Sequence, residues 1–143
     1  MNTLILLGAI AALSASQSGG PITGSWTAQF EGRTFLRLEL KTENEMITGG
    51  ICLGHSLEVD SQGAVRRTDE APLVLTPIFD VKRRASTLTF SRQDGASTDR
   101  FEVRLLDDGG AELRFLLDEE DVRELAASGV PPPKPIHLTK QLK

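Results

Sequence analysis

Apolar and polar residues alternate along most of this chain, and this period of two constrains the fold more than any other feature of the sequence. Successive side chains of an extended strand point to opposite faces, so the alternation predicts strands with one buried and one wet face. It occurs in eight short segments: residues 26–30, 36–40, 47–53, 57–59, 73–81, 88–91, 100–105 and 111–117. Short strands at this spacing predict an all-β barrel or sandwich.

The segments between these strands carry turn residues. Asp94-Gly95 is a strong signal for a tight hairpin, and glycines occupy similar places at Gly32 and Gly109. Pro77 splits the fifth segment, which predicts an edge strand or a bent strand because proline donates no ladder hydrogen bond. Since most connections suit hairpins, we expect an eight-stranded antiparallel up-and-down barrel, closed so that it leaves no sheet edge.

The pattern changes to a helical one after the last of these segments. Asp118 is a good N-cap, and the acidic residues that follow it suit the positive end of a helix dipole. Gly129 is a typical residue just beyond a helix C-terminus. We therefore expect one C-terminal helix over residues 119–128, followed by a proline-rich tail at 131–135 and a last short strand at 136–139.

The first sixteen residues differ from the rest of the chain. Residues 4–13 are almost wholly apolar, and small residues follow them. This is the form of a cleavable secretory signal peptide, and the run is shorter than the roughly 20 residues of a membrane span. We expect a signal peptide at 1–16, a single mature domain at 22–143, a secreted or periplasmic location and no stable membrane span. A core N-terminal strand is the alternative.

Composition narrows the function classes. Sixteen Lys and Arg against 20 Asp and Glu give a net charge of -4, which argues against nucleic acid as a partner. The single cysteine, Cys52, has apolar neighbours that predict a buried thiol without a disulfide. His55 and His137 do not have metal-ligand spacing, and the acidic pair Asp107-Asp108 lies in a turn. We expect no enzymatic activity, no cofactor and no metal.

Two short motifs resemble those of a known family. Gly24-Ser25-Trp26, at the start of the first strand, resembles the Gly-x-Trp signature of lipocalins and related calycins. Thr98-Asp99-Arg100-Phe101 resembles the second lipocalin motif. The order of a Gly-x-Trp strand, a meander and a C-terminal helix is also similar, and the chain resembles small exported bacterial proteins. The resemblance implies a barrel with Trp26 across its closed end and an open mouth for a small hydrophobic ligand.

The interior of such a barrel is either filled by side chains or holds one small ligand. The inward set is apolar: Leu36, Leu38, Leu40, Ile51, Leu57, Val59, Leu88, Phe90, Phe101, Val103, Leu113 and Phe115. If a cavity exists, we expect Leu38, Phe90, Val103 and Phe115 to form the wall of the ligand site and Trp26 its base. The function is then to hold an apolar or amphipathic molecule by burying its surface.

A solid core favours a different function, the binding of another exported protein. Two basic clusters, Arg66-Arg67 and 82–84, flank the loop and the proline-broken strand. We expect contact through the loops near Arg67 and Arg83, or through the proline-rich tail, in that case. The alternative for these clusters is that they are solvated loops, offset by the acidic residues 69–70.

Overall fold

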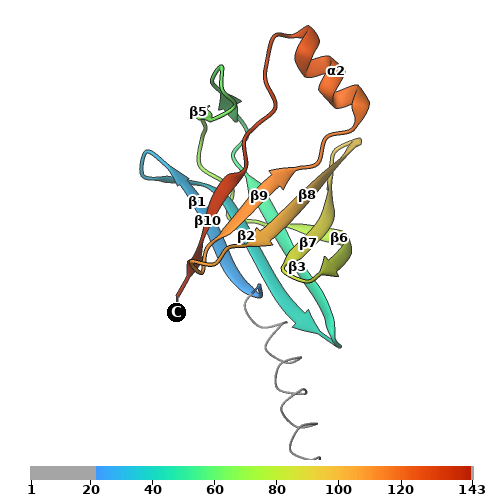
Figure 1. The fold of residues 1–143 in the computed structure, drawn as a ribbon. Coiled ribbons are helices and arrows are strands. Elements are labelled where there is room, and N and C mark those ends of the chain that lie inside the picture. Colours follow the sequence, from blue (N-terminus) through green and yellow to red (C-terminus); the bar gives the residue numbers. More distant parts are fainter. Residues whose placement is uncertain (1–21, 143) are drawn as a thin grey trace, which may run out of the picture.

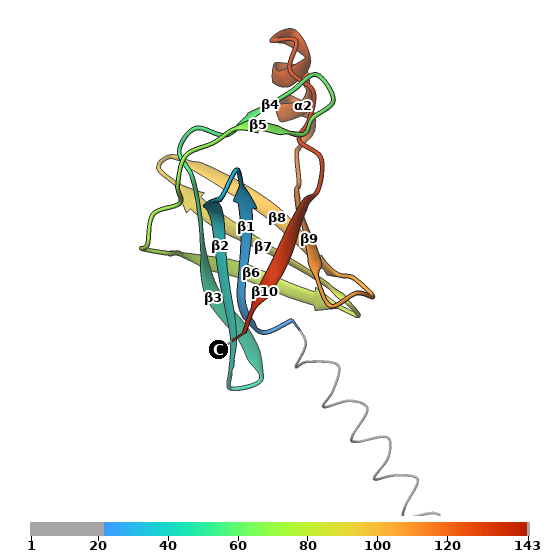
Figure 2. The ribbon, with the colours of Figure 1, turned by 90° about the vertical axis from the view of Figure 1, so that its left-hand side faces the viewer.

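The computed structural model describes residues 22–142, and within them eight strands form a closed antiparallel barrel (Figure 1, Figure 2). The strands are β1 (Gly24–Phe30), β2 (Arg33–Glu43), β3 (Met46–Leu53), β6 (Thr76–Arg84), β7 (Thr87–Asp94), β8 (Ser97–Leu105), β9 (Ala111–Phe115) and β10 (Ile136–Gln141). Their order around the barrel is β1-β10-β9-β8-β7-β6-β3-β2. The predicted all-β up-and-down barrel is confirmed. The predicted signal peptide at 1–16 lies outside the described residues.

One predicted barrel strand lies elsewhere. The segment 57–59 forms β4 (Glu58–Val59), which pairs with β5 (Val65–Arg67) in a separate two-stranded sheet. Asp60 stabilises the turn between them, because its Oδ1 accepts backbone hydrogen bonds from Gln62 at 2.8 Å and Ala64 at 3.1 Å. The short C-terminal strand, β10, takes the eighth place and closes the barrel against β1.

Two-residue turns connect several barrel strands. Asn44 and Glu45, between β2 and β3, both have positive φ, at 51° and 67°, as a type I′ hairpin turn requires. Gly95 follows β7 with a φ of 62°, where the Asp94-Gly95 pair predicts a turn. Tight turns therefore place consecutive strands side by side around the barrel.

The core lies inside the barrel and consists of the inward side chains of its strands. Trp26 is 1% exposed, and its indole Nε1 donates a hydrogen bond of 2.9 Å to the backbone oxygen of Ile22. Most of the predicted inward set is buried: Leu36, Leu38, Leu40, Ile51, Leu88, Phe90, Phe101, Val103 and Leu113. Leu57 and Phe115 are half-buried against this core, whereas Val59 leaves the barrel with β4.

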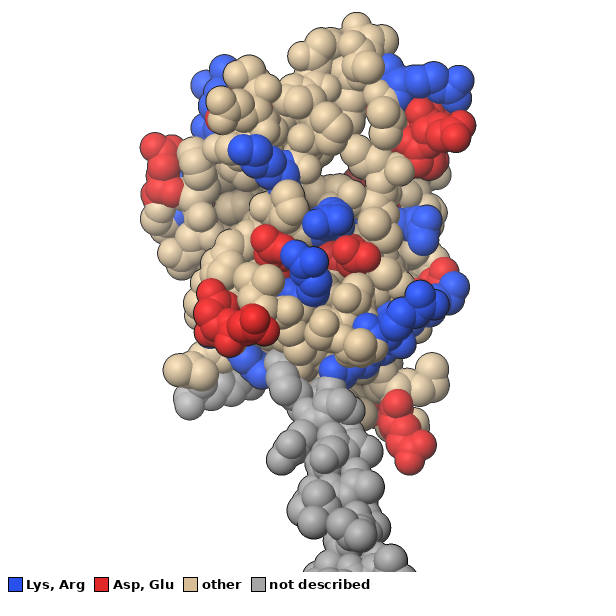
Figure 3. Space-filling model, viewed as in Figure 1, with Lys and Arg blue, Asp and Glu red and all other residues tan. Residues whose placement is uncertain are grey.

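The predicted helix is present as α2 (Glu119–Ala127). Asp118 is its N-cap and forms a capping box with Asp121, so that each side chain accepts a backbone hydrogen bond from the other residue. No residue of α2 is buried, and the space-filling view has an opening between this helix and the barrel (Figure 3). The helix therefore projects from one end of the barrel instead of packing on its wall.

The seam between β3 and β6 has the shortest ladder of the barrel. β3 pairs with β2 along its whole length, but with β6 only at Gly50↔Pro77 and Ile51↔Thr76. Beyond that point β6 continues across the barrel while β3 runs toward its hairpin with β2, so the two strands diverge (Figure 2). A bulge in β6, with Asp80 at a φ of 53°, adds to the divergence.

A segment that we call the strap, residues 71–75, crosses the outer face of β2 and β3. The amide of Ala71 donates to the backbone oxygen of Thr34 at 2.9 Å. The Cys52 thiol donates to the backbone oxygen of Pro72 at 2.9 Å, and the cysteine is buried, as its apolar neighbours predict. A Cβ at Gly50 would lie 2.8 Å from the Leu75 Cβ, so glycine is needed there for the close approach.

Candidate functional site

The predicted ligand wall is tightly packed. Leu38 and Val103 have no exposed surface, and Trp26 and Phe90 are 1% exposed. The Phe101 ring lies 5.5 Å from the Phe90 ring and 5.3 Å from the Phe115 ring, centre to centre. Four of the five predicted residues therefore have almost no surface that a water molecule reaches. Only Phe115 is half-buried, and the role of the five in ligand binding stays a prediction.

A cleft of about 540 Å³ opens where β3 and β6 diverge, and we call it the seam cleft. Apolar side chains make up most of its lining: Met46, Ile47, Ile78, Phe79, Val81 and Leu88. Leu88 is fully buried and belongs to the core, whereas Met46 is 68% and Phe79 45% exposed. The seam cleft therefore connects the core to an apolar rim at the surface.

The sheet register determines which backbone groups of β3 face this cleft. Pro77 has no N–H, so Gly50↔Pro77 is a non-hydrogen-bonded pair, and the neighbouring residues 49 and 51 direct their backbone groups toward β6. By the period of two, Ile47 directs its N–H and C=O the same way. The β3–β6 ladder ends before this residue is reached, so the backbone of Ile47 faces the cleft instead of a strand.

Four polar side chains stand at the seam cleft. Arg83 pairs with Leu88 in the ladder, is half-buried, and donates from Nε to the backbone oxygen of Ala85 at 3.1 Å. Asp80 lies 3.9 Å from the Lys82 ammonium. Glu45 is exposed and has no ion-pair partner among residues 22–142. Thr48 lines the cleft, and its buried hydroxyl forms no hydrogen bond within the described chain.

A second hollow, of about 790 Å³, lies on the outer face of the barrel beside the strap. Its lining mixes polar and apolar residues and comes from β1, β2, β3, the strap, the start of β6 and the end of β10: Gly24, Ser25, Glu39, Leu40, Lys41, Glu43, Thr48, Gly49, Gly50, Leu75, Pro77 and Gln141. Several of these groups already have partners, because the Ser25 hydroxyl donates to Glu39 at 3.3 Å and the Lys41 ammonium lies 3.3 Å from Glu43. Two neighbouring strap residues, Leu73 and Val74, are each 82% exposed.

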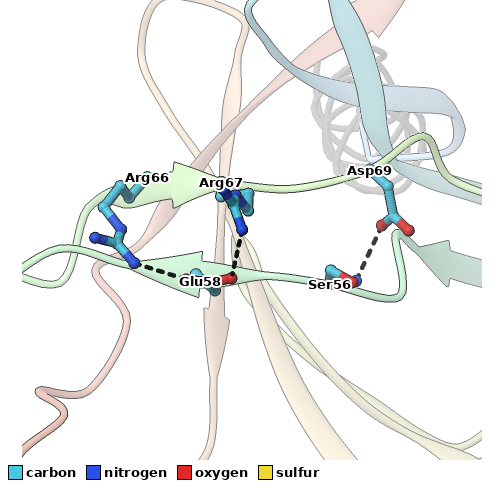
Figure 4. A network of polar contacts seen from close by, with 5 residues as sticks. All are labelled: Ser56, Glu58, Arg66, Arg67 and Asp69. Atoms are coloured by element: carbon cyan, nitrogen blue, oxygen red, sulfur yellow. Dashed lines mark hydrogen bonds and ion pairs between the residues drawn. The ribbon is translucent and has the colours of Figure 1, made fainter.

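The basic clusters do not form one surface. Arg66 and Arg67 both contact the Glu58 carboxylate, at 2.7 and 3.6 Å (Figure 4). Glu58 is therefore their acidic partner, whereas the predicted partner Asp69 accepts a hydrogen bond of 2.9 Å from the Ser56 amide, which lowers the pKa of Asp69. The β4–β5 hairpin, which carries Arg66 and Arg67, lies beyond one end of the barrel (Figure 2). Arg83 belongs to the barrel itself, next to the last residue of β6.

Sequence reasoning missed an ion pair inside the second motif. The Arg92 guanidinium lies 2.6 Å from the Asp99 carboxylate and 5.5 Å from the centre of the Phe101 ring, and its side chain is 14% exposed. Asp99 and Phe101 belong to the Thr98-Asp99-Arg100-Phe101 motif, and the cross-strand pair Arg92↔Asp99 explains why an acid stands there. The sequence signal for this ion pair is the basic residue Arg92, seven positions before Asp99 and on the other side of the Asp94-Gly95 turn.

The fold does not bring the other candidate residues, the histidines and the acidic side chains, together into a metal site in the described part of the chain. No group of three or more His, Cys, Asp or Glu side chains is arranged to hold a metal among residues 22–142. His55 lies near Asp69, in the loop between β3 and β4, and His137 lies on β10 beside Gly110, so the two histidines occupy different parts of the molecule. In the described part of the chain, no helix has the length and apolarity to cross a membrane.

Comparisons with known proteins add nothing to this geometry: the chain matches no protein-family model, no curated protein and no solved structure. The eight-stranded antiparallel barrel is consistent with a calycin-like fold.

Proposed function

We propose that this protein is an exported, non-catalytic interaction module, whose solid barrel presents the seam cleft to another exported protein. The observation that carries the proposal is the packing of the interior, where Leu38 and Val103 have no exposed surface. A ligand among these side chains would have to displace well-packed groups, which costs several kcal/mol per large side chain, on the order of 2–5. Binding at the surface has no such cost.

The seam cleft is the part of the surface best suited to binding. Met46 and Phe79 leave large apolar areas in water on either side of it. Exposed apolar groups around a concave site are typical of interaction surfaces. Arg83, one of the two arginines expected from sequence to contact a partner, lines this cleft. The other, Arg67, is paired with Glu58 and has no role in this interaction.

A second candidate function is the binding of a small amphipathic molecule in a lipocalin-like manner. It is favoured by the size of the seam cleft, about 540 Å³, which lies within the roughly 300–1,000 Å³ of small-molecule sites. In this version the apolar part of the ligand lies on Ile78, Val81 and Leu88, and Arg83 contacts a polar head. The deeper site, with Leu38, Phe90, Val103 and Phe115 as wall and Trp26 as base, requires the core to open.

Site-directed photo-crosslinking in the native host distinguishes these functions. We place benzoylphenylalanine at Phe79, on the rim of the seam cleft, and at Arg114, an exposed position of β9, as the matched control. The interaction module predicts one discrete protein adduct from position 79 and none from position 114. Adducts from neither position, or the same adducts from both, would contradict it. Native mass spectrometry of the unmodified protein detects a retained small molecule, which the second function predicts.

A further inference from the structure

We infer that the partner enters the seam cleft as an extended strand and pairs with the backbone of β3 at Ile47. This inference rests on the proposed function and names the chemistry of the partner segment. The cleft is bordered on one side by β3, where the backbone N–H and C=O of Ile47 point away from β2 and face no other strand. Groups of that kind are best matched by another strand, which supplies donors and acceptors at the same spacing.

The two sides of the cleft differ, and the difference selects β3 as the pairing edge. The β6 side carries three features that hinder strand addition: Pro77, the bulge at Asp80 and the charged Lys82. On the β3 side, residues 46–48 are uncharged, and they pair in regular register with β2. The edge of β3 is therefore regular and unprotected, whereas the edge of β6 is protected, so we expect only β3 to accept a strand.

The apolar lining determines the side chains of the partner strand. Ile47 on β3 and Ile78 and Val81 on β6 are half-buried and line the cleft above the buried Leu88. Side chains of an added strand alternate between this floor and solvent, so apolar residues are needed at every second position.

Charge determines how the strand ends. The nearby cations have contacts within the chain, since Lys82 lies near Asp80 and Arg83 donates to Ala85. Glu45 is the acid at the tip of the β2–β3 hairpin, and it has no ion-pair partner among residues 22–142. A Lys or Arg at the corresponding end of the partner strand complements it. The occupant is therefore an alternating apolar and polar segment with a basic residue at one end.

Synthetic peptides test this inference on the whole protein. The first peptide alternates Val and Thr after a terminal Lys, and two others carry N-methyl groups on all the odd or all the even amides. Strand pairing uses the amides along one edge only. One methylated peptide should therefore bind roughly three- to tenfold weaker than the parent, as expected for losing the hydrogen bond to the Ile47 oxygen, while the other binds nearly as well. Amide exchange at Ile47 should slow when the parent peptide binds.

Charge variants give an independent readout. Glu45→Lys should weaken binding of the Lys-ended peptide by roughly two- to fivefold and favour a Glu-ended peptide, whereas Glu31→Lys, a change in the turn between β1 and β2, should alter neither. Equal binding of the two methylated peptides, unchanged exchange at Ile47, or no binding of the parent would overturn strand pairing. If crosslinks still form at position 79 in that case, the proposed interaction function stands and only the mode of binding is wrong.

Discussion

Trp26 is part of the barrel core and is also hydrogen-bonded to the chain just before β1. Its indole is almost fully buried, and Nε1–H donates to the Ile22 oxygen. The sequence predicts the burial, because a large ring on the apolar face of a strand next to a chain end favours a core position. It does not predict the hydrogen bond, since Ile22 precedes the regular alternation.

Substitutions at Trp26 should separate these two contributions. Trp26→Ala removes the largest fully buried side chain and should lower the free energy of unfolding by about 3–5 kcal/mol. Trp26→Phe keeps most of the apolar volume but leaves the Ile22 oxygen without its donor, so a smaller loss of about 1–3 kcal/mol is expected. Urea denaturation measures both. Equal losses for the two variants would show that the apolar volume of the ring contributes nothing, and no loss in Trp26→Phe would show the same of the hydrogen bond.

Cys52 should make stability depend on pH in the alkaline range. Burial under the strap raises the pKa of its thiol above the ordinary value of 9.0, because the thiolate is poorly solvated there. A pKa raised in the folded state stabilises the fold fully below pH 9.0, and that contribution is lost as pH rises through the folded pKa. Urea denaturation between pH 8 and 11 should therefore show a steeper decline for the natural protein than for Cys52→Ala. Parallel curves would contradict burial of the thiol.

At the scale of elements, local pattern predicts strands well and their partners poorly. The segments 57–59 and 136–139 show the same short alternation, yet only the second joins the barrel, as part of β10. β4 pairs with β5, a few residues away, through the Asp60 turn. β10 pairs with β1 across most of the chain, at Thr27↔Thr139 for example, and no local signal encodes that distance.

The seam cleft was partly visible in the sequence. Pro77 predicts a bent or edge strand, and β6 does leave its partner there. The bulge at Asp80 carries no comparable signal, because aspartate at positive φ is not apparent from its neighbours. The cleft depends on both features and on the length of the β2–β3 hairpin, so its residues could not be selected from alternation alone.

The stability of the barrel should not depend on the stability of the helix α2. Asp118→Ala removes the N-cap and should destabilise the helix by about 1 kcal/mol, whereas Asp118→Asn keeps an acceptor and should have little effect. Because α2 buries no residue, the midpoint of thermal unfolding should stay nearly constant in both variants. Amide exchange in residues 119–127 should quicken only in the alanine variant. A large drop in the unfolding temperature would contradict an independent helix.

At the scale of the molecule, closure depends on the last strand. Removing residues 136–143 deletes β10, which exposes the backbone edges of β1 and β9 and uncovers the buried core around Leu113. We expect loss of cooperative unfolding and aggregation, measured by calorimetry and light scattering. Removing only residues 142–143 is the control, since Leu142 is 92% exposed, and it should leave both measurements unchanged. A soluble, cooperative protein without β10 would show that closure is dispensable.

The pairing of β1 with β10 also has a consequence for the time course of folding. Gln141 donates to Thr27 at 2.7 Å across a separation of 114 residues, so β1 leaves the ribosome long before β10 and waits for it before the barrel can close. Contacts of such long sequence separation slow folding. Until β10 is made, the nascent chain can form only an open sheet with two unpaired edges. Newly made molecules, more than mature ones, therefore need protection from one another.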